Sequence, residues 1–238
     1  KLNVNCEGMI TQEKHWATPA YVKPYKEQNE LNRIDFGNFN KLDTETLNCL
    51  LSLLEKNLQN QDIVIISQQI AGSLFVDEFI EKLLILISKF CDTLFIVDSR
   101  HNSGDFPSAI LKLNDFTAES MVDNTTPNGV GVTRENAIKT AKTLCKKLKK
   151  TIFITRGING CILVDEGVIK EIPSINITGK IDTVGAGDSM LAGICIGLVS
   201  GQDAYNSACL GILAAAVTIQ KLYQTGTVSP EELLMMAS

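Results

Sequence analysis

Histidine is scarce in this chain, and so are long hydrophobic runs and clusters of positive charge. Only 2 of the 238 residues are histidine, and the 7 cysteines include no pair at the C-x-x-C spacing that zinc sites and redox motifs use. The longest apolar run, residues 190–199, is too short to span a bilayer. The net charge is −5. The sequence has one dense basic run, KKLKK at 146–150, which suits the solvated end of a helix. These absences predict no zinc site, no membrane partner and no nucleic-acid partner.

The composition is that of a globular protein with free thiols. Hydrophobic residues make up 45% of the chain, which is enough to bury a sizeable core in one large domain with a smaller appendage. Most of the cysteines lie in apolar segments. Buried, reduced thiols are typical of a reducing compartment, whereas disulfide frameworks are typical of small secreted domains. We therefore expect a cytoplasmic protein.

Strands and helices are predicted to alternate along most of the chain. Short apolar runs such as IVIIS are typical of buried parallel strands, and segments with apolar residues at helical spacing separate them. The predicted strands are 63–67, 94–98, 151–155 and 161–165, and the predicted helices are 43–57, 73–90, 133–150, 188–200, 203–223 and one that starts with a capping box at 229–232. Residues 16–36 are predicted to form short, exposed strands. The pattern predicts an α/β fold with a mostly parallel sheet, whose ligands bind beyond the carboxyl ends of the strands.

The segment KIDTVGAGDSMLAG, residues 180–193, carries the strongest functional signal. Its glycines precede a predicted helix, so that backbone N–H groups at the helix N-terminus can face an approaching anion. A carboxylate there, Asp188, would repel a phosphate that is only bound. It can, however, take a proton from an attacking hydroxyl while the amides stabilise charge on a phosphoryl group. The alternative is that Asp188 is a first-turn residue stabilised by the helix dipole.

Other phosphate-binding motifs are absent from the sequence. There is no GxxxxGK[ST] loop, and Met190 stands at the third glycine of a dinucleotide-binding fingerprint. The segment DTVGAGDSMLAG instead resembles the C-terminal signature of the PfkB, or ribokinase-like, family of carbohydrate kinases. TRGINGCIL at 155–163 and AAAVTIQKLYQTGTVSPEEL at 214–233 are similar to other parts of that family. More weakly, YVKPYKEQNELNRIDF and DIVIIS resemble the heptose-phosphate kinase part of ADP-heptose synthases.

This resemblance implies a three-layer αβα fold, with a partial β lid over 1–40 and a kinase core over 41–238. It implies transfer of the γ-phosphoryl group of ATP to a hydroxyl of a sugar or sugar phosphate, with a heptose 7-phosphate as one candidate and Mg²⁺ neutralising charge. The lid-like segment favours this branch over kinases that act on a vitamin or nucleoside. Because β lids in the family often pair between subunits, a homodimer through the lid is also expected.

The resemblance assigns roles to individual residues. Asp188 matches the catalytic base, and the anion hole corresponds to Gly185, Ala186 and Gly187. The expected nucleotide-binding residues are Thr155, Arg156, Gly157, Gly160, Asn114 and Thr183. Backbone carbonyls of Asp182 and Val184 match the site of a monovalent cation such as K⁺, found in some members.

Three departures from the family pattern keep a second hypothesis open. In the expected N-x-x-E metal motif Asn114 is present, but Thr117 stands at the glutamate position, so Glu119 would have to hold Mg²⁺ through water. Ile212 stands where related kinases often place an asparagine near the adenine. The early glycine-rich sugar motif and the first strand have no match here, so the chain is expected to begin inside or just after the lid. The alternative is a nucleotide-binding or regulatory module with weakened catalysis.

Overall fold

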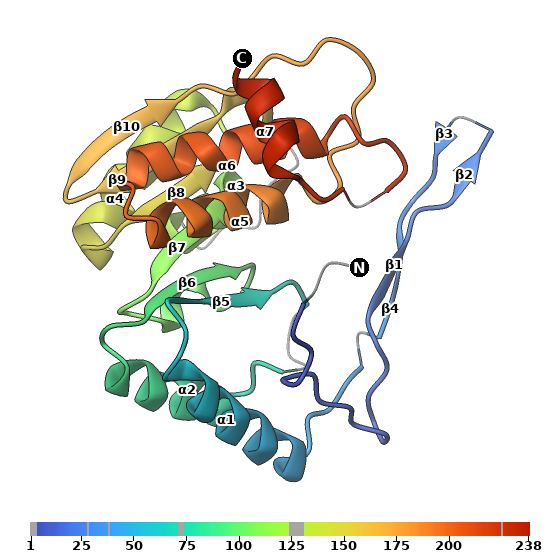
Figure 1. The fold of residues 1–238 in the computed structure, drawn as a ribbon, viewed down its shortest axis with the longest axis vertical. Coiled ribbons are helices and arrows are strands. Elements are labelled where there is room, and N and C mark those ends of the chain that lie inside the picture. The colour runs from blue at the N-terminus through green and yellow to red at the C-terminus, as the bar shows by residue number, and fades with distance from the viewer. Residues whose placement is uncertain (1–3, 28, 38, 71–73, 124–130, 225) are drawn as a thin grey trace. The chain divides into compact units, whose positions relative to one another are not determined.

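The protein folds as two compact units (Figure 1). The structure is a computed structural model, and it describes all residues except 1–3, 28, 38, 71–73, 124–130 and 225. One unit contains Lys1–Gln61 and Gln68–Thr93, and the other contains Asp62–Ser67 and Leu94–Ser238. Among the described residues, no helix is long and apolar enough to cross a membrane.

The first unit combines two small antiparallel ribbons with two helices. Its elements are β1 (Ala20–Val22), β2 (Tyr25–Lys26), β3 (Asn29–Glu30), β4 (Ile34–Phe36), α1 (Thr44–Leu58) and α2 (Asp77–Lys89). Strand β1 pairs with β4, and β2 pairs with β3. Helix α1 begins after Asp43, whose carboxylate accepts a hydrogen bond from Thr46 N at 2.7 Å. This Asp43 cap satisfies one of the amides that every helix start leaves free.

A mixed, mostly parallel six-stranded sheet forms the centre of the second unit, in the order β10-β9-β8-β7-β6-β5. The strands are β5 (Ile63–Gln68), β6 (Leu94–Ser99), β7 (Ile110–Asn114), β8 (Ile152–Thr155), β9 (Cys161–Asp165) and β10 (Val168–Ile172). Strand β7 runs parallel to β6 and β8, whereas β8, β9 and β10 form an antiparallel meander. The side chains of β8 are almost wholly buried, as a sheet covered on both faces requires.

Helices cover both faces of this sheet and make three layers (Figure 1). They are α3 (Asp115–Asp123), α4 (Arg134–Leu148), α5 (Ala186–Val199) and α6 (Ala204–Thr218). Helix α7 (Pro230–Ala237) packs against α6, and short 3₁₀ turns lie at Ser103–Asp105 and Gly157–Asn159. Helix α4 packs on β8, β9 and β10, and α6 packs on β9 and β10 from the other side. Phe153 and Leu163 of the sheet pack in one core with Ile194 of α5.

Helices α5 and α6 pack against each other unusually closely because small residues face each other. A Cβ atom placed on Gly193 would lie 2.7 Å from the Cα of Gly211, and one on Gly197 would lie 2.6 Å from Ser207 Oγ. Neither position could accept a larger side chain without moving the helices apart. The close packing fixes the position of α5 against α6.

The predicted elements are confirmed, with shifts of a few residues at their ends. The last helix begins with the predicted capping box, in which Ser229 and Glu232 bond each other's backbone N–H groups. The helix predicted over 203–223 ends earlier, at Thr218. Strands β7 and β10 and helix α3 are not among the predicted elements.

Candidate functional site

The turn that leads into α5 is held by hydrogen bonds on both sides. The N–H of Asp182 donates to Ile219 O at 2.8 Å, and the carboxylate of Asp182 accepts a hydrogen bond from Val184 N at 3.1 Å. The N–H of Ala186 donates to Thr183 O at 3.2 Å. Gly185 then turns the chain with φ = +79°, a left-handed conformation that glycine adopts without steric cost. The backbone is therefore fixed before the helix begins.

The first turn of α5 presents unpaired amides. No side chain caps the helix, and the first i→i+4 bond is the one from Ser189 N to Gly185 O at 2.9 Å. Among the described residues, nothing accepts a hydrogen bond from the backbone N–H of Gly187 or Asp188. Such N–H groups and the positive end of the helix dipole together favour a bound anion.

Asp188 lies in the same turn as these free amides, and its side chain is exposed. The position suits a base that acts on a hydroxyl close to the amides. It also lets the carboxylate stabilise the helix through the dipole, so both roles considered for this residue are compatible with its location.

A second glycine-rich turn joins β8 to β9. The N–H of Arg156 donates to Gly160 O at 2.8 Å and closes the turn. Gly157 and Gly160 both have positive φ, +54° and +79°. At Gly160 a Cβ atom would lie only 2.1 Å from Ile172 O, so the turn passes directly against the end of β10. Only glycine allows that approach.

A cavity of about 290 Å³ lies between the two glycine-rich turns and α5 and α6. Most of its wall is hydrophobic, with Ile158, Ile175, Met190, Ile212 and Ile219 among the contributors. Six of the residues predicted from the sequence line it: Thr155, Gly157, Gly160, Thr183, Ala186 and Gly187. An apolar cleft with a few polar groups at one end is typical of a small-molecule or cofactor site.

The other predicted residues lie outside this lining. Gly185 and Asp188 flank it within the α5 turn, and Asp182 precedes that turn. Arg156 is buried, and among the described atoms its Nε has no hydrogen-bond partner. Burial raises the pKa of the neighbouring Asp115 carboxyl, and the charge of Arg156 counters that shift only in part.

The expected metal motif lies where β7 passes into α3. The amide oxygen of Asn114 accepts a hydrogen bond from Thr117 N at 2.7 Å, and this bond closes the start of the helix. Glu119 lies further along α3 and is half-buried. Within the part of the chain that the structure describes, no group of three His, Cys, Asp or Glu side chains is placed to hold a metal ion.

One charged residue near α5 is absent from the sequence-based predictions. Lys112 of β7 is 5% exposed, and its Nζ lies 2.7 Å from Oδ2 of Asp98, at the end of β6. A Cβ atom built on Gly187 would lie 3.1 Å from this ammonium. A lysine inside the apolar run ILKLN was the available signal, since a buried charge needs a partner.

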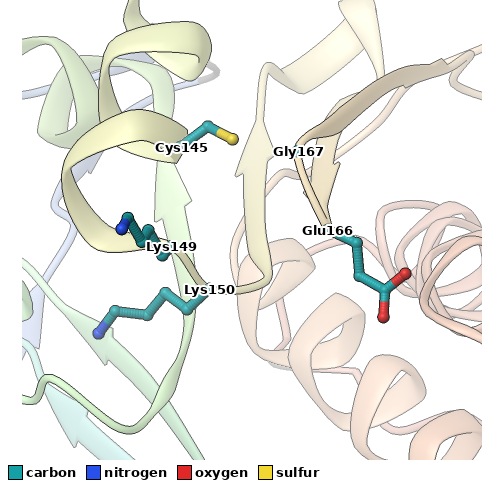
Figure 2. Close-up of a pocket in the computed structure, with 5 residues that line it drawn as sticks. All are labelled: Cys145, Lys149, Lys150, Glu166 and Gly167. Carbon is teal, nitrogen blue, oxygen red and sulfur yellow. The ribbon is translucent and has the colours of Figure 1, made fainter.

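A smaller cavity of about 220 Å³ lies at the other end of β8, where α4 ends and β9 turns into β10 (Figure 2). Its lining residues are Cys145, Lys149, Lys150, Glu166 and Gly167. In Figure 2 the two lysines extend away from Glu166, and the carboxylate points in the opposite direction. Because its charged groups diverge, this cavity lacks the converging polar groups of a binding site.

Comparisons with known proteins identify relatives of this chain. The model of the family described as pfkB family carbohydrate kinase matches residues 1–231. A Bifunctional protein HldE from Hydrogenovibrio crunogenus is 26% identical over 222 residues, which cover 91% of this chain and 43% of that protein. Another Bifunctional protein HldE, from Campylobacter fetus, is 29% identical over 198 residues, which cover 76% of this chain and 40% of that protein. The chain thus spans less than half the length of these curated relatives.

A solved structure shares the fold. Ribokinase from Thermotoga maritima matches with a TM-score of 0.70 at 19% identity, over 93% of this chain and 70% of that one. This likeness confirms the predicted ribokinase-like α/β architecture.

Proposed function

The chain belongs to the pfkB family of carbohydrate kinases, and from this we propose that it transfers the γ-phosphoryl group of ATP to a hydroxyl of a sugar or sugar phosphate. The observation that carries the proposal is the first turn of α5, where the free amides of Gly187 and Asp188 adjoin a carboxylate. Gly187 also lines the cavity, so this turn meets the pocket proposed for the nucleotide. The resemblance to heptose-phosphate kinases supports a heptose 7-phosphate as the first acceptor to test.

The proposed reaction is an in-line displacement at phosphorus. The acceptor hydroxyl loses its proton to the carboxylate of Asp188, its oxygen forms a bond to the γ-phosphorus, and the bond from that phosphorus to the ADP oxygen breaks. The amides of Gly185, Gly187 and Asp188 stabilise the charge on the phosphoryl oxygens. The N–H of Ala186, which was also expected in the anion hole, already donates to Thr183 O.

The nucleotide is proposed to occupy the cavity, with its base against Ile212 and neighbouring apolar side chains and its phosphates towards Thr183 and Gly187. This orientation follows from chemistry, because the apolar wall suits a base and the free amides suit an anion. Thr155, Gly157 and Gly160 would form the opposite side. No role in contacting phosphate is needed for Arg156 in this arrangement.

Bound ions are part of the proposal. Mg²⁺ in kinases is held by substrate phosphates and one or two carboxylates, so the sparse donor set of Asn114 and Glu119 fits an ion bound mainly by the nucleotide. When bound, it would neutralise phosphate charge. K⁺ is proposed at the carbonyls of Asp182 and Val184, which accept no hydrogen bond from the described residues.

Free thiols support the proposed cytoplasmic location. All 7 cysteines are free in the structure. A protein with this many unpaired cysteines suits a reducing compartment.

A module that binds nucleotide without turnover is the second candidate, and two observations favour it. Ile212 forms part of the cavity wall without offering a hydrogen bond, and Thr117 replaces the expected glutamate. Calorimetry with ATP and Mg²⁺, followed by a coupled assay of ADP release on a panel of sugars and sugar phosphates, separates the candidates. We expect ADP release that depends on one acceptor class. Nucleotide binding without release on any acceptor would overturn the kinase assignment in favour of the module.

A further inference from the structure

Lys112 is a buried cation whose ionic partner satisfies it only in part. Its ammonium carries three N–H donors, and one lies 2.7 Å from Asp98 Oδ2. Among the described residues, no other acceptor lies within hydrogen-bond distance of this ammonium. At 5% exposure, water cannot readily replace the missing partners. A charge buried in this way is costly unless something else completes its coordination.

The surroundings of Lys112 make the charge more unfavourable still. The ammonium lies beside Gly187, where a Cβ atom would be only 3.1 Å away, and Gly187 belongs to the uncapped first turn of α5. The N-terminus of a helix carries partial positive charge, so two positive groups meet here. Asp98 pairs with the ammonium, and the carboxylate of Asp188 lies in the same first turn of α5. Gly187, beside the ammonium, also lines the cavity.

We propose that Lys112 binds the phosphoryl group that is transferred, together with the amides of Gly187 and Asp188. This inference rests on the proposed kinase function and names a further residue of the same site. The ammonium donates its free N–H groups to phosphoryl oxygens and has no part in the proton transfer to Asp188. Asp98 is a positioning residue, because it holds the ammonium beside the helix N-terminus without reaching the phosphate itself.

Binding of three nucleosides and nucleotides tests the proposal without requiring turnover. The probes are adenosine, ADP and the β,γ-imido analogue of ATP, each with Mg²⁺ and without a sugar, measured by calorimetry. Because a hydrogen bond to a charged group contributes about 1.5–3 kcal/mol, Lys112→Met should weaken the ATP analogue roughly 10- to 100-fold. ADP should lose less, and adenosine should be unchanged. Asp98→Asn, like Lys112→Met, should reduce the preference for the ATP analogue over ADP.

A matched control is available in the same unit. Lys150 is also partly buried and donates to a backbone carbonyl, that of Phe106, but it lies at the smaller cavity (Figure 2). Lys150→Met should leave the affinities for all three probes unchanged.

A second variant separates a loss of binding from a loss of folding. Lys112→Met alone leaves Asp98 buried without its partner, which can destabilise the fold. Replacing the pair together, with Lys112→Met and Asp98→Leu, removes both charges and should restore stability while still reducing the preference for the ATP analogue over ADP.

Two results would overturn the proposal. One is an unchanged ratio of affinities for the ATP analogue and ADP in the paired variant. The other is wild-type protein that binds the ATP analogue no more tightly than adenosine. A failure of the kinase function itself looks different: the wild type would keep the Lys112-dependent ratio but phosphorylate no acceptor.

Discussion

Cys161 and Cys195 of the second unit are buried, unlike the other cysteines. Burial raises the pKa of the Cys161 thiol to about 12 and that of the Cys195 thiol to about 11. The thiolate is the reactive form, so both groups should be inert in the native state. Cys6, Cys49 and Cys91 are exposed.

Native protein should therefore react with a thiol reagent such as dithionitrobenzoate at its exposed cysteines, whereas Cys161 and Cys195 should react only after unfolding. Peptide mapping of the labelled protein identifies the sites. Equal labelling rates for Cys161 and Cys49 in native protein would contradict the burial described here.

Individual site residues differed in how far the sequence could predict them. Asp188 and Gly187 belong to one local motif at a helix start, and the physics of that turn depends on neighbours in the sequence. Lys112 depends on Asp98 of another strand and on a helix that follows far along the chain. These groups come together only after the sheet has formed. In the sequence, the one indication of them is a charged residue inside an apolar strand.

At the scale of elements, Gly160 is the glycine of the turn between β8 and β9 that lies against β10. Gly160→Ala would place a methyl group 2.1 Å from Ile172 O and force a positive φ on a residue with a side chain. Gly167→Ala is the matched control, because Gly167 also has positive φ but has nothing within 4 Å of the new Cβ.

We expect the control to lose about 1–2 kcal/mol of unfolding free energy from backbone strain alone. Gly160→Ala should lose roughly 1–3 kcal/mol more from overpacking. Denaturant unfolding of both variants measures the difference. Equal losses would show that the contact with β10 is not tight.

The two strands that the sequence did not predict share a physical reason. Strand β7, ILKLN, is short and interrupted by Lys112, and β10, VIKEI, has two charged residues within five positions. Neither shows the continuous apolar run of a buried strand. In β7 a charged side chain is buried with a specific ionic partner, and β10 lies at the edge of the sheet, where fewer side chains need to be apolar. Helices α5 and α6 were predictable because their apolar and small residues extend over several turns.

At the scale of the molecule, the exposed ribbons of the first unit suggest how copies of the chain could associate. Strands β1 and β4 expose Tyr21, Val22, Ile34 and Phe36, and a two-stranded ribbon leaves its outer edges unpaired. From these features we propose that the ribbon of β1 and β4 pairs with a second copy of the chain, as the resemblance to the kinase family implies.

Sedimentation velocity should show a dimer for the wild type, and Phe36→Glu should shift it to a monomer because a charge would be buried in the apolar contact. Val168→Glu is the control, since Val168 is equally exposed but belongs to β10 in the other unit. A wild type that remains monomeric at high concentration would contradict the proposal.

The role of Asp188 as catalytic base is tested by a comparison of two variants. Asp77 is an exposed first-turn aspartate of α2, so Asp188→Asn and Asp77→Asn both remove a carboxylate from an uncapped helix start. The measurement is acceptor-dependent ADP release with the best substrate of the sugar panel. We predict a loss of at least ~10²-fold for Asp188→Asn and near-normal release for Asp77→Asn. Near-normal release from folded Asp188→Asn protein would contradict this prediction and leave Asp188 with only its role at the helix dipole.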